Sequence, residues 1–167
     1  MTDTLTLNIG DLVIRHGKIL KVFEIKKDTV NLQPFFDFQG NNGLAFTLDL
    51  KNAYDGHIRK LVSKGKIKDL LNLIIKKSTS KAKSPVFDPK TALSQNQLEE
   101  TLWVIKNLWL EKRAKSNVLP SGKLNIFKRA MLQATEEIAA TNHTSPEQAK
   151  LLILSGLKLS AKNTSKN

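Results

Sequence analysis

The chain has 167 residues, a formal net charge of +12 and a hydrophobic fraction of 40%, which is enough for one domain or for two small ones. It contains no cysteine, which excludes disulfides, thiolate metal sites and cysteine nucleophiles. No run of about 18 apolar residues occurs, which excludes a transmembrane helix, and residues 1–8 carry no apolar signal core. We therefore expect a cytoplasmic protein.

The positive charge is concentrated in the C-terminal two thirds of the chain. Residues 1–60 hold 8 Lys and Arg against 7 Asp and Glu, whereas residues 61–167 hold 19 against 8, so the net charges are +1 and +11. This asymmetry favours a polyanion such as nucleic acid as the partner of the C-terminal part, and a different partner for the N-terminal part. A lysine-rich surface that serves only solubility is the alternative.

Residues 5–50 carry the pattern of short strands. Residues 19–25 are rich in aliphatic and aromatic side chains, and residues 44–50 alternate between leucine or phenylalanine and other types, as half-buried strands do. Residues 40–43 contain Asn-Gly, a strong hairpin signal. The partner strand would contain Phe35, Phe36 and Phe38. We predict a small antiparallel β-barrel over residues 1–56.

From residue 61 onward the apolar pattern has a helical period. One stripe follows Ser63 as a candidate N-cap: Ile67, Leu70, Leu71, Ile74 and Ile75. Residues 78–93 contain two prolines and many polar residues, which predicts a loop. Ser94 and Gln97 have the spacing of a capping box for the next helix, whose buried stripe would be Leu98, Leu102, Ile105 and Trp109.

Two further helices complete the predicted helical domain, residues 57–160. The first spans residues 122–141, with a buried face of Ile126, Ala130, Ala134 and Ile138. Ser145, Pro146 and Gln148 predict the start of the last helix, which would dock through Leu152, Ile153 and Leu157. Residues 161–167 are expected to form a frayed polar tail. The predicted fold class is thus α+β, a β-barrel followed by an all-α domain.

The residues that could carry catalysis are scattered. His16, His57 and His143 have no spacing that suits a metal site. The carboxylate pairs Glu99/Glu100 and Glu136/Glu137 point about 100° apart on their helices and are interpreted as solvated. We expect no enzymatic activity, no metal, no cofactor and no small-molecule substrate.

Residues 64–93 hold eight lysines and only two acidic residues. Lysines spread in this way suit contacts with phosphates, which supply affinity without reading bases. Phe87 lies in the same basic segment between Pro85 and Pro89. An aromatic residue there either packs into the core, which we favour, or serves as a wedge against a base step.

Several segments match a known pattern in the same order along the chain. Residues 104–109 (VIKNLW) are similar to a Val-Val-Arg-Asp-Leu-Trp helix, and residues 119–131 and 145–149 are similar to the starts of the two helices that follow it. Residues 9–13 (IGDLV) are similar to the Val-Gly-Asp-x-Val opening of a Tudor-like barrel. Together they resemble the CarD family of bacterial regulators that bind RNA polymerase.

This resemblance implies a Tudor-like barrel that binds the β subunit of RNA polymerase and a basic helical domain that binds promoter DNA. The protein would modulate the stability of the open complex and would be associated with the nucleoid. The expected polymerase contacts are Phe36, Phe38, Phe46 and Thr47. The expected DNA contacts are Lys81, Lys83, Phe87, Lys90, Lys106 and Arg113. The family's wedge tryptophan has no counterpart here, and Phe87 is the one aromatic residue of the loop.

Two other hypotheses use the same sequence features. A general nucleic-acid-binding protein, associated with the nucleoid or the ribosome, would need the basic surface but no polymerase contact. A protein-interaction adaptor whose lysines serve only solubility would show no salt-dependent binding to DNA.

Overall fold

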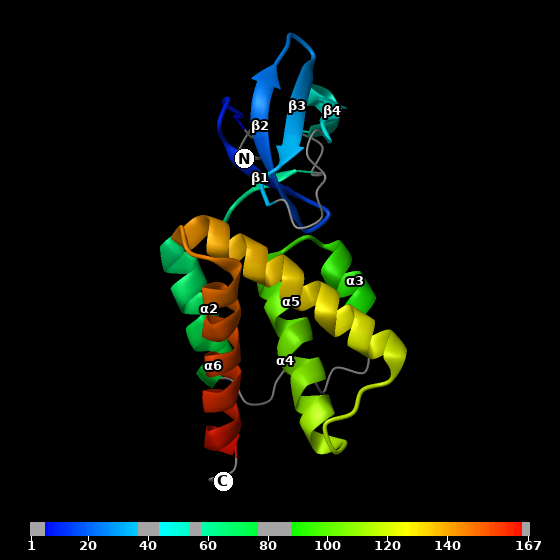
Figure 1. Cartoon of the computed structure of the whole chain (residues 1–167), viewed down its shortest axis with the longest axis vertical. Coiled ribbons are helices and arrows are strands. Elements are labelled where there is room, and N and C mark those ends of the chain that lie inside the picture. The colour runs from blue at the N-terminus through cyan, green and yellow to red at the C-terminus, as the bar shows by residue number, and fades with distance from the viewer. Residues whose placement is uncertain (1–5, 37–43, 54–57, 77–87, 165–167) are drawn as a thin grey trace. The chain divides into compact units, whose positions relative to one another are not determined.

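The computed structural model describes residues 6–36, 44–53, 58–76 and 88–164, with the side chains of residues 52, 74–76 and 161–164 outside the description. The chain divides into two compact units, Met1–Leu61 and Val62–Asn167. We call them the sheet unit and the helical unit (Figure 1). Their boundary falls at the step in charge, with a net charge of +1 before it and +11 after it.

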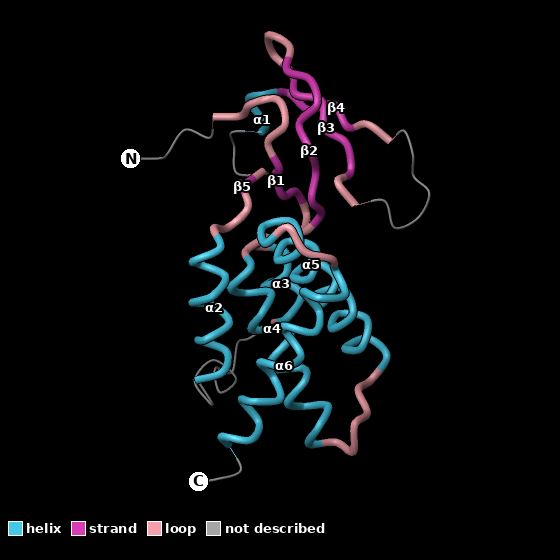
Figure 2. Tube along the Cα trace, turned by 60° about the vertical axis from the view of Figure 1, so that its left-hand side comes forward, coloured by secondary structure: helices cyan, strands magenta, loops and turns pink. Residues whose placement is uncertain are grey.

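Within the described residues, the sheet unit contains five antiparallel strands in the order β4-β3-β2-β1-β5. Figure 2 shows the strands gathered in this unit, together with the short helix α1. The hairpin between β1 and β2 turns through His16 and Gly17, both with positive φ, as a two-residue type I′ turn requires. The elements are β1 (Leu12–Arg15), β2 (Lys18–Ile25), β3 (Thr29–Pro34), β4 (Phe46–Asp49), α1 (Leu50–Asn52) and β5 (Arg59–Lys60).

Alternation along the strands builds the core of the sheet unit. Val22 pairs with Leu32, and Val30 pairs with Leu48 on the next strand, so apolar side chains of neighbouring strands meet on one face. The fully buried members of this cluster include Val13, Val22, Val30, Leu32 and Ala53, and Phe46 and Leu48 pack against it. The predicted alternation of residues 44–50 therefore holds at β4.

Two expectations for the N-terminal part need correction. The predicted boundary at residue 56 is too early, because β5 pairs with β1 beyond it. The described strands also form an open sheet with β4 and β5 at its edges, where the sequence predicts a closed barrel. Leu50 begins α1 and does not continue the strand.

The described residues of the helical unit form five packed helices. α4 contacts α2, α3, α5 and α6, and α2 and α6 contact each other. Their shared core contains Leu98, Leu102, Ile105, Ala134 and Ile138. The helices are α2 (Lys64–Lys76), α3 (Pro89–Ser94), α4 (Leu98–Ala114), α5 (Ser121–Asn142) and α6 (Pro146–Thr164).

Side-chain caps fix two of the predicted helix starts. Ser63 Oγ accepts a hydrogen bond from the Lys66 backbone N–H at 3.2 Å at the start of α2. At the start of α6, Ser145 and Gln148 form the predicted capping box: Gln148 N–H donates to Ser145 Oγ, and Ser145 N–H donates to Gln148 Oε1. Each cap satisfies backbone donors that have no partner within the helix.

The capping box predicted at Ser94 is wrong. Asp88 caps an earlier helix by accepting from the N–H groups of Lys90 and Thr91, so residues 89–93 of the predicted loop belong to α3. Ser94 is the last residue of that helix, and its hydroxyl donates to the Thr91 carbonyl. The next helix begins at Leu98 with no side-chain cap on Gln97.

Some burial predictions for the helices are also wrong. Trp103 is 3% exposed and belongs to the core, whereas Trp109, the predicted core residue, is half-buried. Glu136 and Glu137 are buried, not solvated, and Glu137 Oε1 accepts a hydrogen bond from the Val62 N–H at 3.2 Å. α6 continues to Thr164, into the predicted tail.

Candidate nucleic-acid interface

The helical unit turns its cations outward and most of its acids inward. Of its eight acidic residues, Asp69, Asp88 and Glu147 are exposed, and the others are half-buried or buried. Of the thirteen cations whose side chains are described, ten are exposed. The ratio of basic to acidic residues is therefore higher on the surface of this unit than in the unit as a whole. The exposed cations are Lys64, Lys66, Lys68, Lys90, Arg113, Lys115, Lys128, Arg129, Lys150 and Lys158.

Three of the six predicted DNA contacts belong to the described part of the chain. Lys81, Lys83 and Phe87 lie outside the described residues. Lys90 is exposed in the first turn of α3, and Arg113 is exposed in the last turn of α4. The described residues thus retain two of the six predicted contacts on the surface, on two different helices.

Lys106 is the predicted DNA contact that the structure contradicts. Its side chain is 1% exposed, with the ammonium 5.3 Å from the centre of the Trp103 ring. Burial removes water from the ammonium and lowers the pKa of Lys106 below its ordinary value. A residue buried in this way contributes to the core and does not reach a phosphate.

Arg113 is held in place by an aromatic ring. Its guanidinium lies 5.0 Å from the centre of the Trp109 ring, one turn earlier on α4. A planar guanidinium stacked on a ring keeps its N–H groups available at the rim and loses less side-chain entropy when it binds an anion. Among the predicted contacts that the structure describes, Arg113 is therefore the best-prepared phosphate ligand.

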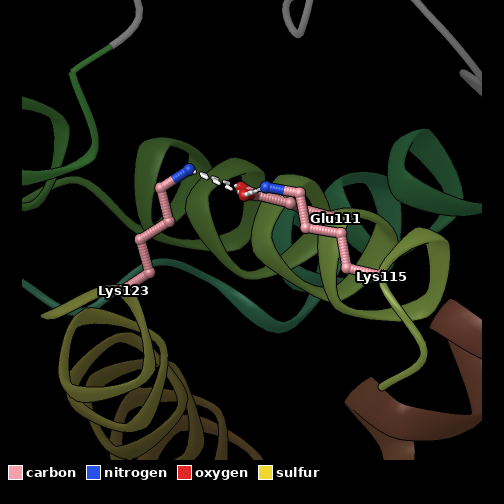
Figure 3. A network of polar contacts seen from close by, with 3 residues as sticks. All are labelled: Glu111, Lys115 and Lys123. Carbon is pink, nitrogen blue, oxygen red and sulfur yellow. Dashed lines mark hydrogen bonds and ion pairs between the residues drawn. The ribbon is translucent and has the colours of Figure 1, made fainter. Parts of the chain in front are cut away.

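Two further cations are occupied by a carboxylate. Lys123 Nζ lies 2.7 Å from Glu111 Oε2, and Lys115 Nζ lies 2.9 Å from Glu111 Oε1 (Figure 3). The hydrogen bonds from Lys115 and Lys123 lower the pKa of Glu111. This cluster joins the C-terminal end of α4 to the start of α5 and makes both lysines less available to phosphates.

Lys128 and Arg129 of α5 were not among the predicted contacts. Both are exposed, on the outward side of a helix whose inner face contains Ala130 and Ala134. Their position in the sequence, between the half-buried Ile126 and the buried Ala130 of the same helix, could have identified them. They add a basic patch to the middle of α5.

The predicted polymerase contacts lie at and near one edge of the sheet. Phe46 and Thr47 are on the edge strand β4, where Phe46 packs against the core and Thr47 is exposed. Phe36 is half-buried beyond β3, with the ring of Phe35 at 4.8 Å in an edge-to-face contact. Phe38 lies outside the described residues.

A row of polar contacts crosses the outer face of the sheet and ends at Thr47. Thr47 Oγ1 donates to Asn31 Oδ1 at 2.7 Å, and Asn31 Nδ2 donates to Glu24 Oε2 at 2.6 Å. The hydrogen bond from Asn31, followed by that from Lys26, lowers the pKa of Glu24. The hydroxyl of Thr47 is thus engaged within the sheet.

The backbone of β4 points alternately toward and away from β3. Leu50 N–H donates to the Asp28 carbonyl, so in the same register Leu48 and Phe46 also face β3. Thr47 lies between them and directs its N–H and C=O away from β3. This geometry is the template for an added strand.

No protein-family model and no curated protein sequence matches the chain. In the part of the chain that the structure describes, no helix is long and apolar enough to cross a membrane. Nor do three His, Asp or Glu side chains come together as metal ligands within the described residues.

Proposed function

We propose that this protein is a non-catalytic transcription regulator of the CarD type, with a Tudor-like sheet unit that binds the RNA polymerase β subunit and a helical unit that binds promoter DNA. The observation that carries the proposal is the division of charge. A near-neutral unit with an edge strand is joined to a unit with a net charge of +11.

The DNA half of the proposal is supported by the side chains on the helical surface. Ten exposed cations face solvent there against three exposed acids, a ratio that favours contact with phosphates and release of counterions. Among the described cations, Arg113 on Trp109 and the pair Lys128–Arg129 are the residues we assign to the duplex. Binding of this kind positions the protein without reading the sequence.

The polymerase half of the proposal is supported by β4. Its outward N–H and C=O at Thr47 can extend the sheet of a partner, and main-chain hydrogen bonds then supply the affinity. A regulator bound at both places would stabilise whichever promoter state it binds more tightly, so it would shift the closed-to-open equilibrium without catalysing a reaction.

The polymerase contact is tested with full-length variants at Thr47. Thr47→Pro removes the outward N–H of the edge strand. It leaves the hydrogen bonds between β3 and β4 intact, because the Thr47 N–H does not take part in them. Thr47→Val is the matched control, since it loses the same hydroxyl interaction with Asn31 and keeps the N–H. In capture assays with bacterial RNA polymerase, we expect wild type and Thr47→Val to retain the enzyme and Thr47→Pro to lose it.

The same assay decides between the two nucleic-acid hypotheses. If Thr47→Pro and Thr47→Val capture polymerase equally, the polymerase contact does not involve the outward backbone of β4. Failure of wild type to capture polymerase, with DNA binding intact, would favour a general nucleic-acid-binding protein. Circular dichroism of each variant establishes that the sheet unit is folded.

A further inference from the structure

The helical unit contains an apolar groove that the proposed DNA and polymerase contacts do not use. α2 and α6 lie side by side (Figure 1), and the groove along them has a volume of about 410 Å³. Ile67 and Leu71 of α2 and Leu152 and Leu159 of α6 supply its apolar surface. A volume of this size suits a row of side chains from a ligand.

The leucines on the α6 side are unusually exposed. Leu152 is 42% exposed and Leu159 is 51% exposed, although the sequence predicts that Leu152 docks the helix. They are two turns apart, about 10.5 Å along the axis, and so form one stripe. Gly156 lies between them in the lining of the groove and is itself buried.

The charged residues at the rim of the groove are all positive. Lys64 and Lys68 line it from α2, one turn apart, and both are exposed. Among the described residues that line the groove, none is acidic. A partner that covers the leucines therefore brings its own flank against two positive charges.

We propose that this groove binds an amphipathic helix with an acidic flank, contributed by a partner protein. Apolar residues at i, i+4 and i+7 of such a helix would pack on Leu152, Leu159 and Leu71, as helix-in-groove ligands do. Carboxylates one turn apart would face Lys64 and Lys68.

The properties of the groove argue against three other ligands: another segment of this chain, a second copy of the protein and a DNA duplex. Residues 77–87 contain three lysines and no acid, and residues 161–167 contain two lysines and no acid, so these segments would place like charges together. A second copy placed face to face would bring the rim lysines of both copies together. A duplex would satisfy the lysines but would leave the leucines against a polar backbone.

The test uses the full-length protein and a synthetic 18-residue helical peptide with leucines in a heptad stripe and glutamates on one flank, followed by fluorescence anisotropy. We expect the acidic peptide to bind wild type, and Lys64→Glu combined with Lys68→Glu to weaken binding about tenfold or more. A peptide with lysine in place of glutamate should bind that double variant better than wild type. Lys66→Glu is the matched control, since Lys66 lies about 200° from Lys64 around α2.

The apolar half of the site is tested by Leu159→Glu, with Leu132→Glu as control. Leu132 is 52% exposed on α5 and does not line the groove. We expect loss of binding for the first variant alone. The proposal is overturned if the acidic peptide does not bind wild type, or if both peptides bind equally. It is also overturned if Leu159-dependent self-association or association with anionic vesicles occurs without peptide binding.

Discussion

Lys106 places a cation in the core of the helical unit, next to the ring of Trp103. Loss of hydration disfavours its charged form, and the ring recovers part of that energy through its negative face. A methionine of similar length would fill the same space without a charge. The position is thus a place where the sequence retains a buried charge at a cost in stability.

We expect Lys106→Met to raise the free energy of unfolding by about 1 kcal/mol at pH 7. Because burial lowers the pKa of Lys106 in the folded protein, the unfolded chain binds more protons between the folded pKa and the ordinary value. The free energy of unfolding of wild type therefore rises with pH in that interval. The difference in this free energy between Lys106→Met and wild type should narrow toward about pH 10. Urea unfolding measures both effects, with the exposed Lys150→Met as control. A variant less stable than wild type at pH 7 would show that the ammonium contributes more than it costs.

Glu111 gives a second prediction at the scale of single side chains. Its hydrogen bonds with Lys115 and Lys123 lower its pKa, so its contribution to stability is present above its ordinary pKa and is lost as the pH falls through the lowered one. We expect Glu111→Gln to cost about 0.5 kcal/mol at pH 7 and low salt, and the difference from wild type to shrink as the pH falls below the ordinary glutamate pKa of about 4.3. Thermal unfolding across pH measures it, with Asp69→Asn as control. A difference that does not shrink as the pH falls would assign the effect to packing.

At the scale of helices, the start of α6 depends on two reciprocal hydrogen bonds. Ser145→Ala removes the acceptor of the Gln148 N–H and should cost about 1 kcal/mol. Ser94→Ala is the matched control, because Ser94 has the same Ser-x-x-Gln spacing but ends α3, and we expect it to cost less than about 0.5 kcal/mol. Denaturant unfolding of the two variants compares them. Equal costs would mean that Ser145 does not act as a cap.

These two serines show why helix boundaries were only partly predictable. Both have a Gln three residues later, but Asp88 and Pro89 start a helix upstream of Ser94, so Ser94 already has helical backbone. Asn96 then adopts positive φ between α3 and α4, a conformation that Asn tolerates. The capping pattern is local, and the competing helix that overrides it begins several residues earlier.

The candidate site was predictable to a similar degree. The charge step followed from composition, whereas the edge position of Thr47 was expected only from the family resemblance. The burial of Lys106 did not, because residues 101–106 of α4 are all buried. A helix covered on nearly all sides has no polar face that would mark its charged residues as exposed. The packing of α2, α3, α5 and α6 against α4 decides this, and it joins segments far apart in the sequence.

At the scale of the whole molecule, the two units differ in the electrostatic potential that they present to a partner. The sheet unit balances its charges, and some of its acids are paired, as Glu24 is with Lys26 and Asp11 with Lys60. The helical unit buries or half-buries five of its eight acids, and so the positive potential of the chain arises there. Association with a polyanion should then depend on which unit loses a charge, and not only on the net charge.

The last prediction compares equal reductions of charge in the two units. Lys128→Gln with Arg129→Gln removes two exposed cations from α5, and Lys18→Gln with Lys21→Gln removes two from β2. We expect the α5 variant to bind duplex DNA more weakly and to reduce the slope of log K against log salt by about one for each phosphate that it no longer neutralises. The β2 variant should keep the wild-type slope. Fluorescence anisotropy across a salt titration measures both. Equal slopes for the two variants would mean that DNA responds to net charge alone and that α5 does not contact phosphates.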